Sequence, residues 1–435
     1  MNPSFFLYNL IGTGVGIALG PALRLFFRKK SRELERFDQR MGRYPKTMRL
    51  NSGDQPRAWL HAVSVGEVGA AAAVVNKLQG LRPDCHVMVS CTTHQGLARA
   101  REQFGDRVIC FYAPFDLPST VDRALSMMRP DLLVFLETEI WPNWIVRASH
   151  RGVRIAIING RISVRSIDSY RKIKPLIRYT LSHVDFFSMI SIADAARIES
   201  LGADRRRIRI NGNAKFDSPD PQAGGMRAKQ WARTLFNLAD RQPVFVAGST
   251  RHPEERIILD AHFRILQVYP DALLIIAPRH IDRIAEIEGW ISSSGLSYQR
   301  RTELDSEHCK RTAPVVLLDT IGELLATYSI ATFVFCGGSL VPKGGQNVLE
   351  PAMWSKPIMH GPSMEDFADA QQLIDKAGGG VTVHHAGEMA DIALGWINDP
   401  STAGAAGSAA RRVILSHRGA AGKHAAVIAE LMGTR

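Results

Sequence analysis

The sequence contains little cysteine, and its cysteines form no pattern. Among its 435 residues there are five: Cys85, Cys91, Cys110, Cys309 and Cys336. They are scattered, and no C-x-x-C pair occurs. An odd, unpatterned set is typical of a reducing compartment and argues against a disulfide framework and a zinc site.

Several nucleotide-binding and nucleic-acid-binding signatures are also missing. The absence of a Walker A sequence argues against a P-loop NTPase. The absence of an Asp-x-Asp pair argues against a sugar-nucleotide transferase that needs a divalent metal. Glu137 and Glu139 could hold a metal, but the neighbouring Trp141 and Trp144 favour a structural role. We therefore predict no metal site, and without zinc-finger or RNA-binding motifs we expect no nucleic-acid partner.

What the chain does have is length and positive charge. A chain of this length predicts two domains. The formal net charge of +12 indicates an anionic partner, which could be a phosphorylated substrate or an acidic membrane surface.

The N-terminal segment is apolar. Residues 4–23 carry no charge, and basic residues follow from Arg24 to Arg32. About 20 apolar residues suffice to span a bilayer. We therefore predict a membrane anchor over residues 1–28, with the body of the protein on the cytoplasmic side. The alternatives are a helix lying in the membrane interface or docked on its own domain.

Two further features bear on a membrane. Gly12, Gly14 and Gly16 follow no strand, so we interpret them as small residues of a membrane helix rather than a dinucleotide fingerprint. Residues 165–179 interleave Arg and Lys with Ile, Leu and Tyr. This segment is either a solvated helix face or a surface for anionic lipid headgroups.

The remaining chain alternates short apolar runs with amphipathic stretches, which predicts parallel sheets flanked by helices. A breaker-rich linker near residues 221–242 separates two such series. We therefore predict an α/β fold with two Rossmann-like domains, residues 29–220 and 243–400. The first series of strands is expected at residues 59–63, 86–90, 108–112, 132–136, 154–158, 186–190 and 207–210, and the second at residues 244–247, 273–277, 315–318, 332–336, 356–359 and 380–383.

Glu67 occupies a distinctive position in the first domain. It follows the buried-type run W-L-H-A-V and the small residues Ser64 and Gly66, and it precedes an Ala/Val-rich stretch. It therefore lies where a strand ends and a helix begins, which is the ligand-binding edge of α/β sheets. A carboxylate there can act as a general base, or it can simply cap the helix.

Five turns of the second domain follow predicted strands. They are G-S-T-R (residues 248–251), A-P-R-H (277–280), D-T-I-G-E-L (319–324), C-G-G-S-L (336–340) and G-G-Q-N-V-L-E-P-A (344–352). Small-residue turns at helix N-termini can present N–H groups to an anion, and glycines allow close ligand approach. Arg279 could bind a phosphate, and Glu350 could accept hydrogen bonds from ribose hydroxyls. Together these turns predict a nucleotide site.

These motifs, with E-T-E-I-W-P-N (residues 137–143) and N-G-N-A-K-F-D (211–217), resemble the 3-deoxy-D-manno-octulosonic acid (Kdo) transferases of lipopolysaccharide synthesis. The resemblance implies a GT-B fold, two Rossmann-like domains facing a cleft, with the C-terminal helix of residues 401–435 crossing back to the first domain. It implies that Kdo passes from CMP-Kdo to the glucosamine disaccharide of the lipid A precursor. It also implies the cytoplasmic face of a bacterial inner membrane as the location, and no cofactor.

By the same resemblance, Glu67 is the general base, and Glu137 and Lys215 support the transition state. Lys215 could stabilise charge on the departing phosphate or on the Kdo carboxylate. The implied contacts to CMP-Kdo are Pro278, Arg279, Ile321, Gly322, Glu323, Gly337, Gly338, Ser339, Asn347, Val348, Leu349 and Glu350.

Two other readings remain open at this point. One is another GT-B enzyme, such as a UDP-sugar transferase or a sugar-nucleotide epimerase. The other is a non-catalytic nucleotide-binding membrane scaffold. Binding of CMP or UDP, detected as a rise in melting temperature, separates the first alternative from the Kdo transferase.

Overall fold

The chain forms two compact units in the computed structural model, which describes residues 2–27, 31–48, 55–217, 222, 225–305 and 310–433. The first unit comprises Met1–Ser218 and His417–Arg435, and the second comprises Pro219–Ser416. Cys309 and Gly224 lie outside the described residues.

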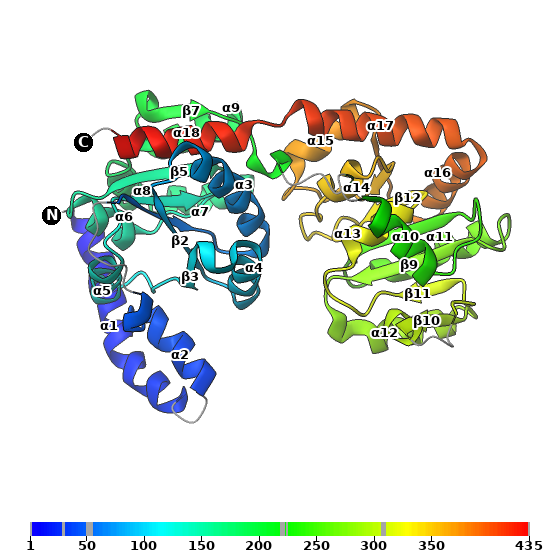
Figure 1. Cartoon of the computed structure of the whole chain (residues 1–435), viewed down its shortest axis with the longest axis horizontal. Coiled ribbons are helices and arrows are strands. Elements are labelled where there is room, and N and C mark those ends of the chain that lie inside the picture. The colour runs from blue at the N-terminus through cyan, green and yellow to red at the C-terminus, as the bar shows by residue number, and fades with distance from the viewer. Residues whose placement is uncertain are drawn as a thin grey trace. The chain divides into compact units, whose positions relative to one another are not determined.

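The first unit is built on a seven-stranded parallel sheet of order β3-β2-β1-β4-β5-β6-β7 (Figure 1). Strand β1 lies inside the sheet and pairs with β2 and β4, so that Leu60 lies opposite Val89 on one side and Val134 on the other. The strands are apolar runs because helices cover both faces of a parallel sheet. Their bounds are β1 Arg57–His61, β2 His86–Cys91, β3 Ile109–Tyr112, β4 Leu132–Leu136, β5 Arg154–Gly160, β6 Phe186–Met189 and β7 Ile208–Ile210.

The helices of the first unit lie between these strands and at both ends of the chain. They are α1 Pro3–Phe27, α2 Ser31–Arg40, α3 Val65–Leu81, α4 His94–Phe104, α5 Pro118–Met128, α6 Pro142–Ser149, α7 Val164–Lys172, α8 Lys174–Leu181, α9 Ile192–Leu201 and α18 Ala420–Gly433, with short 3-10 turns η1 Lys46–Met48, η2 Gly105–Arg107, η3 Arg205–Arg207 and η4 Ala214–Asp217.

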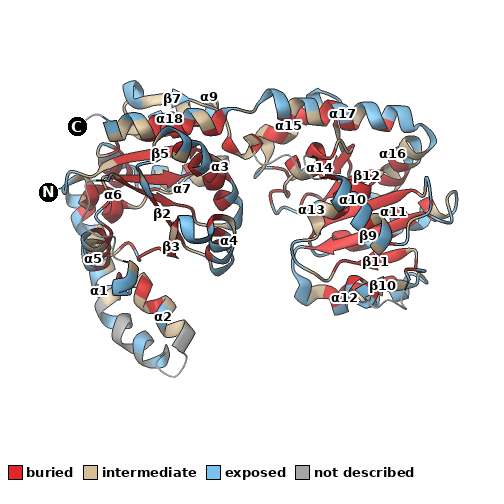
Figure 2. Ribbon diagram, in the orientation of Figure 1, coloured by how far each residue is buried: buried red, intermediate tan, exposed pale blue. Residues whose placement is uncertain are grey.

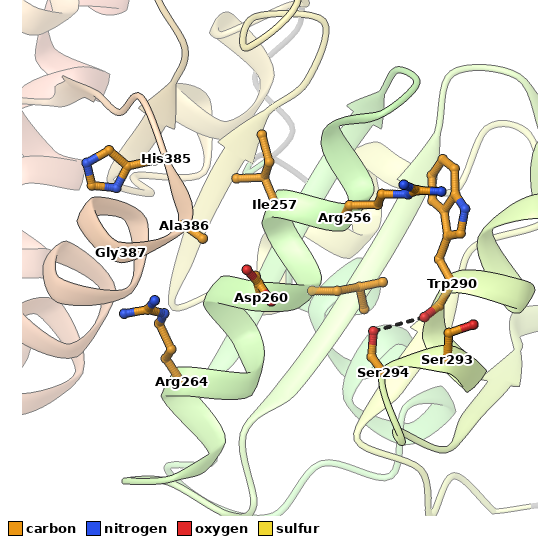
Figure 3. Close-up of a pocket in the computed structure, with 11 residues that line it drawn as sticks. Arg256, Ile257, Asp260, Arg264, Trp290, Ser293, Ser294, His385, Ala386 and Gly387 are labelled. Carbon is orange, nitrogen blue, oxygen red and sulfur yellow. Dashed lines mark hydrogen bonds between the residues drawn. The ribbon is translucent and has the colours of Figure 1, made fainter.

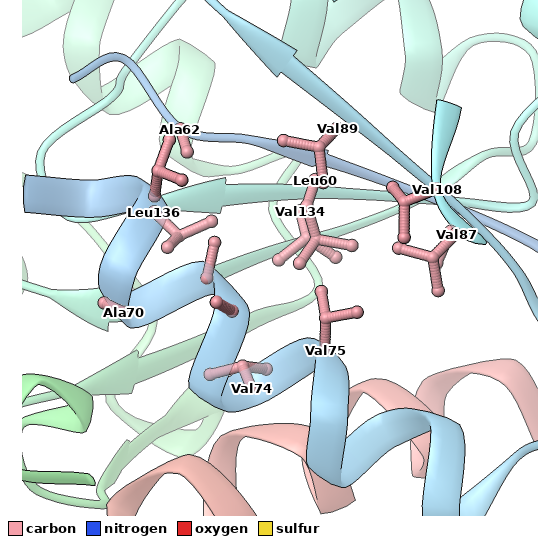
Figure 4. Close-up of a cluster of buried hydrophobic side chains, with 14 of the residues drawn as sticks. Leu60, Ala62, Ala70, Val74, Val75, Val87, Val89, Val108, Val134 and Leu136 are labelled. Carbon is pink, nitrogen blue, oxygen red and sulfur yellow. The ribbon is translucent and has the colours of Figure 1, made fainter. Parts of the chain in front are cut away.

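One hydrophobic core of this unit joins α3 to the sheet. Val74 and Val75 of α3 belong to the same buried cluster as Leu60, Val89 and Val134 of the strands (Figure 4). Ala421, Ala425 and Ile428 of the C-terminal helix α18 also belong to this cluster. The last helix of the chain therefore packs on the helix that carries Glu67.

The N-terminal helix α1 is docked on its own domain. Phe5 is buried in a small cluster with Val146 and Leu176, and the Tyr8 hydroxyl donates to Asp116 at 2.8 Å. Among the helices in the described part of the chain, none combines the length and apolar composition that crossing a membrane requires. The predicted spanning anchor over residues 1–28 is therefore not supported.

The glycines of α1 have a local explanation. A Cβ built on Gly12 would lie 3.3 Å from the Leu117 side chain, and one built on Gly16 would lie 2.9 Å from it. Four glycines together with Asn9 and Thr13 dilute the apolar content of the helix. At Gly12 and Gly16 the absence of a side chain thus lets the helix approach the domain, a role different from the predicted packing in a membrane.

The second unit repeats the architecture with a seven-stranded parallel sheet of order β10-β11-β9-β8-β12-β13-β14. The strands are β8 Val244–Thr250, β9 Leu273–Pro278, β10 Tyr298–Arg300, β11 Val315–Leu317, β12 Phe333–Cys336, β13 Ile358–His360 and β14 Gly380–Thr382. Its helices are α10 Gly225–Leu235, α11 Glu254–Leu266, α12 Ile284–Ser293, α13 Leu324–Thr327, α14 Leu349–Met353, α15 Ala368–Lys376, α16 Ala386–Asn398 and α17 Pro400–Ser416, with 3-10 turns η6 Ile281–Arg283, η7 Arg301–Asp305 and η8 Tyr328–Ile330. Buried residues concentrate on the strands of both sheets (Figure 2).

The prediction of two α/β domains with parallel sheets is confirmed. The predicted linker, residues 221–242, contains helix α10. After Asn398 the chain forms two helices, of which α17 belongs to the second unit and α18 to the first. Asp217 receives the N–H groups of Gly419 at 2.6 Å and Ala421 at 2.7 Å, and it thereby ties the start of α18 to the first unit.

Candidate functional site

Glu67 lies in the first turn of α3, just after β1 ends. Its Oε2 accepts the N–H of Val63 at 2.8 Å, and its Oε1 accepts the Ser64 hydroxyl at 3.1 Å. The Ser64 side chain makes no capping bond to α3, so its hydroxyl serves Glu67 instead. The carboxylate is only 8% exposed. Glu67 is thus an anchored carboxylate at the carboxyl edge of the sheet.

Thr93, the N-cap residue of α4, holds the carbonyl of Val63, the residue whose N–H donates to Glu67. The Val63 carbonyl accepts the N–H and the hydroxyl of Thr93, each at 3.1 Å. The same hydroxyl oxygen accepts the Gly96 N–H as the N-cap of α4. A Cβ on Gly96 would lie 3.1 Å from the Val63 oxygen, so glycine is needed for this approach. Residue Val63 is therefore fixed at its carbonyl by Thr93 and at its N–H by Glu67.

Glu137 and Lys215 form an ion pair at the same edge of the sheet. Glu137 directly follows β4, and its backbone has a positive φ of 56°. Lys215 lies in η4, and its Nζ is 2.6 Å from Glu137 Oε1. The two side chains are 15% and 19% exposed. The structure therefore brings Glu67, Glu137 and Lys215, the three predicted catalytic residues, to one edge of one sheet.

Burial raises the pKa values of two carboxyl groups at this edge of the sheet. Burial, and after it the negative charge of Glu137, raises the pKa of Glu67 to about 8. Burial also raises the pKa of Glu139 to about 7, although the Trp141 indole donates to that carboxylate at 2.5 Å. A carboxylate with a raised pKa is a stronger base once it is ionised. This arrangement suits proton abstraction at slightly alkaline pH.

In the second unit, the predicted ligand-binding turns lie at the ends of β8, β9, β11 and β12, which are neighbours in the sheet, and the predicted contacts begin at the end of β9. Pro278 ends β9 opposite Thr250 of β8 and is buried, whereas Arg279 is exposed. The Arg279 N–H donates to the Thr250 carbonyl at 3.0 Å. The backbone is thus held while the guanidinium faces solvent, an arrangement that suits binding of a phosphate or carboxylate.

The loop after β11 contains Ile321, which is 84% exposed, and Gly322, whose φ is 96°. Glu323 is held by both nitrogens of an Arg301 fork, at 2.7 and 2.8 Å, and by the Thr320 hydroxyl at 2.6 Å. Glu323 therefore fixes the loop, and Ile321 offers an exposed apolar surface. Arg301, which sets this loop, was not predicted.

The turn after β12 differs from the prediction. Glu254 is fully buried, and its carboxylate accepts the N–H groups of Gly338 at 2.6 Å, Ser339 at 2.9 Å and Leu340 at 2.8 Å. It also accepts the Arg251 N–H at 2.7 Å. The Glu254 carboxylate thus accepts hydrogen bonds from N–H groups that we expected to face an anionic ligand. These N–H groups belong to the turns at residues 248–251 and 336–340.

Ser339, one of the predicted contacts, has a side chain that forms its hydrogen bonds within the domain. Its side chain is fully buried; its hydroxyl donates to the Cys336 carbonyl at 2.5 Å and accepts the Gly361 N–H at 2.7 Å. The hydroxyl is therefore engaged inside the domain. A Cβ on Gly337 would lie 2.5 Å from Thr250 Cα, so this glycine serves close packing of the turn.

The last group of predicted contacts surrounds the start of α14. The Asn347 amide donates to Glu350 at 3.0 Å, and Asn347 Oδ1 accepts the Leu349 N–H at 3.1 Å. Val348 and Leu349 are buried, so their side chains belong to the core, whereas Glu350 is partly exposed. Glu350 is thus the residue of this group that best suits hydroxyl recognition.

A groove of the second unit lies apart from these contacts. It measures about 900 Å³ and is lined by residues of α11, α12 and the start of α16 (Figure 3). The Arg256 guanidinium lies 4.7 Å from the centre of the Trp290 ring in this groove. No predicted contact lines it. Among the described residues, no group of three or more His, Cys, Asp or Glu side chains could hold a metal.

Sequence comparison relates the chain to characterised proteins. A family model described as 3-Deoxy-D-manno-octulosonic-acid transferase (kdotransferase) matches residues 35–218. The 3-deoxy-D-manno-octulosonic acid transferase of Haemophilus influenzae is 32% identical over 365 residues, covering 83% of this chain and 84% of that protein. The enzyme of the same name from Bordetella pertussis is 30% identical over 371 residues, again covering 83% of this chain and 84% of that protein.

A bifunctional glycosyltransferase/methyltransferase of Fusobacterium nucleatum is 36% identical over 323 residues, which cover 74% of this chain and 49% of that protein. The chain thus spans about half the length of this relative. Among solved structures, a glycosyltransferase from Rickettsia africae matches with a TM-score of 0.61 and 11% identity, covering 88% of this chain and 100% of that one. At that identity the likeness concerns the fold alone.

Proposed function

Because this chain belongs to the family of 3-deoxy-D-manno-octulosonic acid transferases, we propose that it transfers Kdo from CMP-Kdo to a hydroxyl of the glucosamine disaccharide of the lipid A precursor. The proposed arrangement is that of a GT-B glycosyltransferase, in which the first domain binds the acceptor and the second binds CMP-Kdo. The observation that carries the mechanism is the anchored, buried Glu67 carboxylate beside the Lys215–Glu137 pair.

In this mechanism Glu67 takes the proton from the acceptor hydroxyl. The acceptor oxygen then attacks the anomeric carbon of Kdo, the bond from that carbon to the CMP phosphate breaks, and the product has inverted configuration. Lys215 stabilises negative charge on the departing phosphate or on the Kdo carboxylate. Glu137 holds Lys215 in place through the 2.6 Å ion pair. CMP is a good leaving group, so we propose that the reaction proceeds without a metal ion.

On the donor side, the exposed Arg279 guanidinium suits an anionic group of CMP-Kdo. Ile321 offers an apolar surface for the cytosine ring, and Gly322 allows the ligand to approach the backbone. Glu350 suits the ribose hydroxyls. Glu254 and Arg301 keep the loops in shape through their bonds to the 338–340 turn and to Glu323.

The proposed location is the cytoplasmic face of the bacterial inner membrane, with α1 lying in the interface. Its residues Phe6, Leu7, Leu10 and Ile11 are 51 to 60% exposed and recur at helical spacing. Helix α8, which packs on α1, carries the exposed basic residues Lys174 and Arg178. An apolar helix face beside basic side chains suits an anionic bilayer surface.

Vesicle flotation tests this location. We expect the protein to float with vesicles containing anionic lipid and the Leu10→Asp variant to float several-fold less, with an unchanged melting temperature because Leu10 is 60% exposed. Equal flotation of both proteins would contradict an interfacial role for α1.

Nucleotide binding tests the donor assignment. A ligand that binds only the native state raises the melting temperature, by an amount equivalent to about 2.7 kcal/mol at a hundred times its Kd. We expect CMP to stabilise the protein, UDP to do so much less, and Arg279→Ala to abolish the effect of CMP. Stabilisation by UDP and not by CMP would overturn the proposed donor and favour a UDP-sugar enzyme.

A further inference from the structure

A buried histidine of the C-terminal helix contacts the segment that carries Lys215. His424 of α18 is fully buried, and its Nε2 lies 3.0 Å from the Gly212 carbonyl oxygen. Its Nδ1 lies 2.7 Å from Ser188 Oγ. A carbonyl oxygen can only accept, so Nε2 carries the proton and Nδ1 accepts the Ser188 hydroxyl. The ring is therefore neutral, and burial, which lowers its pKa to about 4, keeps it so.

The segment of residues 211–214, which precedes Lys215, is also held by residues of β5 and β6. Asn159, at the end of β5, accepts the Ala214 N–H at 2.8 Å through its Oδ1. The Asn211 amide donates to Ser188 Oγ at 2.5 Å, and the Asn211 N–H donates to the Met189 carbonyl at 2.9 Å. The backbone from residue 211 to residue 214 thus has few degrees of freedom left. Lys215 comes directly after this fixed stretch.

The path from His424 to the ion pair is short. Gly212 has a φ of 90°, a conformation that few other residues adopt. This backbone conformation sets the direction of the Gly212 carbonyl. The bond from His424 fixes that carbonyl. Asn213 Oδ1 then accepts the Lys215 N–H at 3.0 Å, and the Lys215 side chain reaches Glu137.

We propose that His424 is a positioning residue for the transfer reaction, which acts through the Gly212 carbonyl to hold Lys215 against Glu137. The inference rests on the proposed function, since it assigns His424 a role only through Lys215. It makes the last helix of the chain part of the catalytic machinery of the first unit, in addition to its packing on α3.

Two substitutions separate the two short hydrogen bonds of His424, whose Nδ1 also lies 3.5 Å from the Asn159 N–H as a long acceptor. A glutamine amide can take the place of Nε2 and donate to Gly212, but it leaves the Ser188 hydroxyl without its acceptor. An asparagine oxygen can take the place of Nδ1 and accept from Ser188, but it leaves the Gly212 carbonyl without its donor. Each variant loses one short buried hydrogen bond, so we expect similar drops in melting temperature.

The two variants differ in catalysis if the inference holds. We expect His424→Asn to lower kcat by about tenfold or more, with KM for CMP-Kdo within about twofold, because misplacing a catalytic group by about 1 Å can cost 10²-fold. We expect His424→Gln to lose no more than about threefold. Ile428→Ala, which removes a buried contact of the same helix, is the matched control and should reduce the melting temperature without a tenfold loss of kcat.

A double-mutant cycle completes the test. If His424 acts through Lys215, then His424→Asn costs nothing further once Lys215→Ala is present. Equal kcat losses in His424→Asn and His424→Gln, or a full loss in the Lys215→Ala background, would overturn the inference while leaving the proposed function intact. Full transfer by Lys215→Ala itself would instead overturn the role proposed for Lys215.

Discussion

Replacing Glu137 by glutamine should move the pH dependence of the reaction. The negative charge of Glu137 is, after burial, the largest influence that raises the pKa of Glu67 to about 8. Removing a neighbouring carboxylate charge lowers the pKa of a carboxyl group by on the order of one unit, which corresponds to about 1.4 kcal/mol. In Glu137→Gln, Lys215 is no longer neutralised by the Glu137 carboxylate 2.6 Å away. Its positive charge then also lowers the pKa of Glu67.

The assay is the rate of CMP release at limiting CMP-Kdo between about pH 6 and 9.5, since kcat/KM reports the pKa of the free enzyme. For the wild type, the rate should rise with pH and level off above about pH 8, because the base must be ionised. In Glu137→Gln the rise should occur on the order of one pH unit lower, whatever the loss of maximal rate.

Glu139→Gln provides the matched control for this measurement. Glu139 also raises the pKa of Glu67, but it does so less than Glu137. The rise should therefore move by less in Glu139→Gln than in Glu137→Gln. A rise that stays near pH 8 in Glu137→Gln, or one that persists in Glu67→Gln, would refute the reasoning.

Three further predictions concern residues outside the catalytic trio. Thr93→Val removes the hydroxyl that donates to the Val63 carbonyl and should lower kcat by about tenfold, whereas Thr93→Ser should retain the wild-type rate. Equal rates in both variants would contradict a role of Thr93 in holding residue Val63, whose N–H donates to Glu67. Glu254→Gln replaces a carboxylate oxygen that accepts N–H groups by an amide that donates, so the melting temperature should fall and the stabilisation by CMP should be lost; unchanged binding of CMP would contradict the loop role. Burial lowers the pKa of His262 to about 4, so its contribution to the free energy of unfolding is present above pH 6.5 and is lost as the pH falls toward 4. At pH 5 the loss should be about 2 kcal/mol. Urea unfolding at pH 7.5 and pH 5 should therefore show a smaller loss of stability for His262→Leu than for the wild type.

Much of the fold can be predicted from the sequence because parallel strands are buried on both faces. Short apolar runs such as 132–136 and 244–247 are typical of strands that helices cover on both faces. The position of Glu67 follows in the same way, since the end of a buried run and the start of an Ala-rich helix define the edge of the sheet. The strand β10 was missed because its residues Y-Q-R are only partly buried at the end of the sheet.

What the sequence does not reveal is which polar groups are consumed inside the protein. G-G-S-L has the composition of an anion-binding turn, but Glu254, far upstream in the chain, takes three of its N–H groups. Ser339 likewise forms its bonds within the domain. The contact of His424 with Gly212 joins the Ala-rich C-terminal helix to a loop that is far away in the sequence. No local sequence pattern predicts this contact.

The central claim is that Glu67 is the base of a Kdo transfer reaction, and product mass tests it most directly. Wild-type protein and the Glu67→Gln variant would be incubated with lipid A precursor and CMP-Kdo in the presence of EDTA, and the lipid would be weighed by mass spectrometry. The wild type should add at least one Kdo unit, and Glu67→Gln should be slower by a factor on the order of 10²–10⁴. No mass gain with folded, CMP-binding wild type, or equal rates for both proteins, would contradict the account.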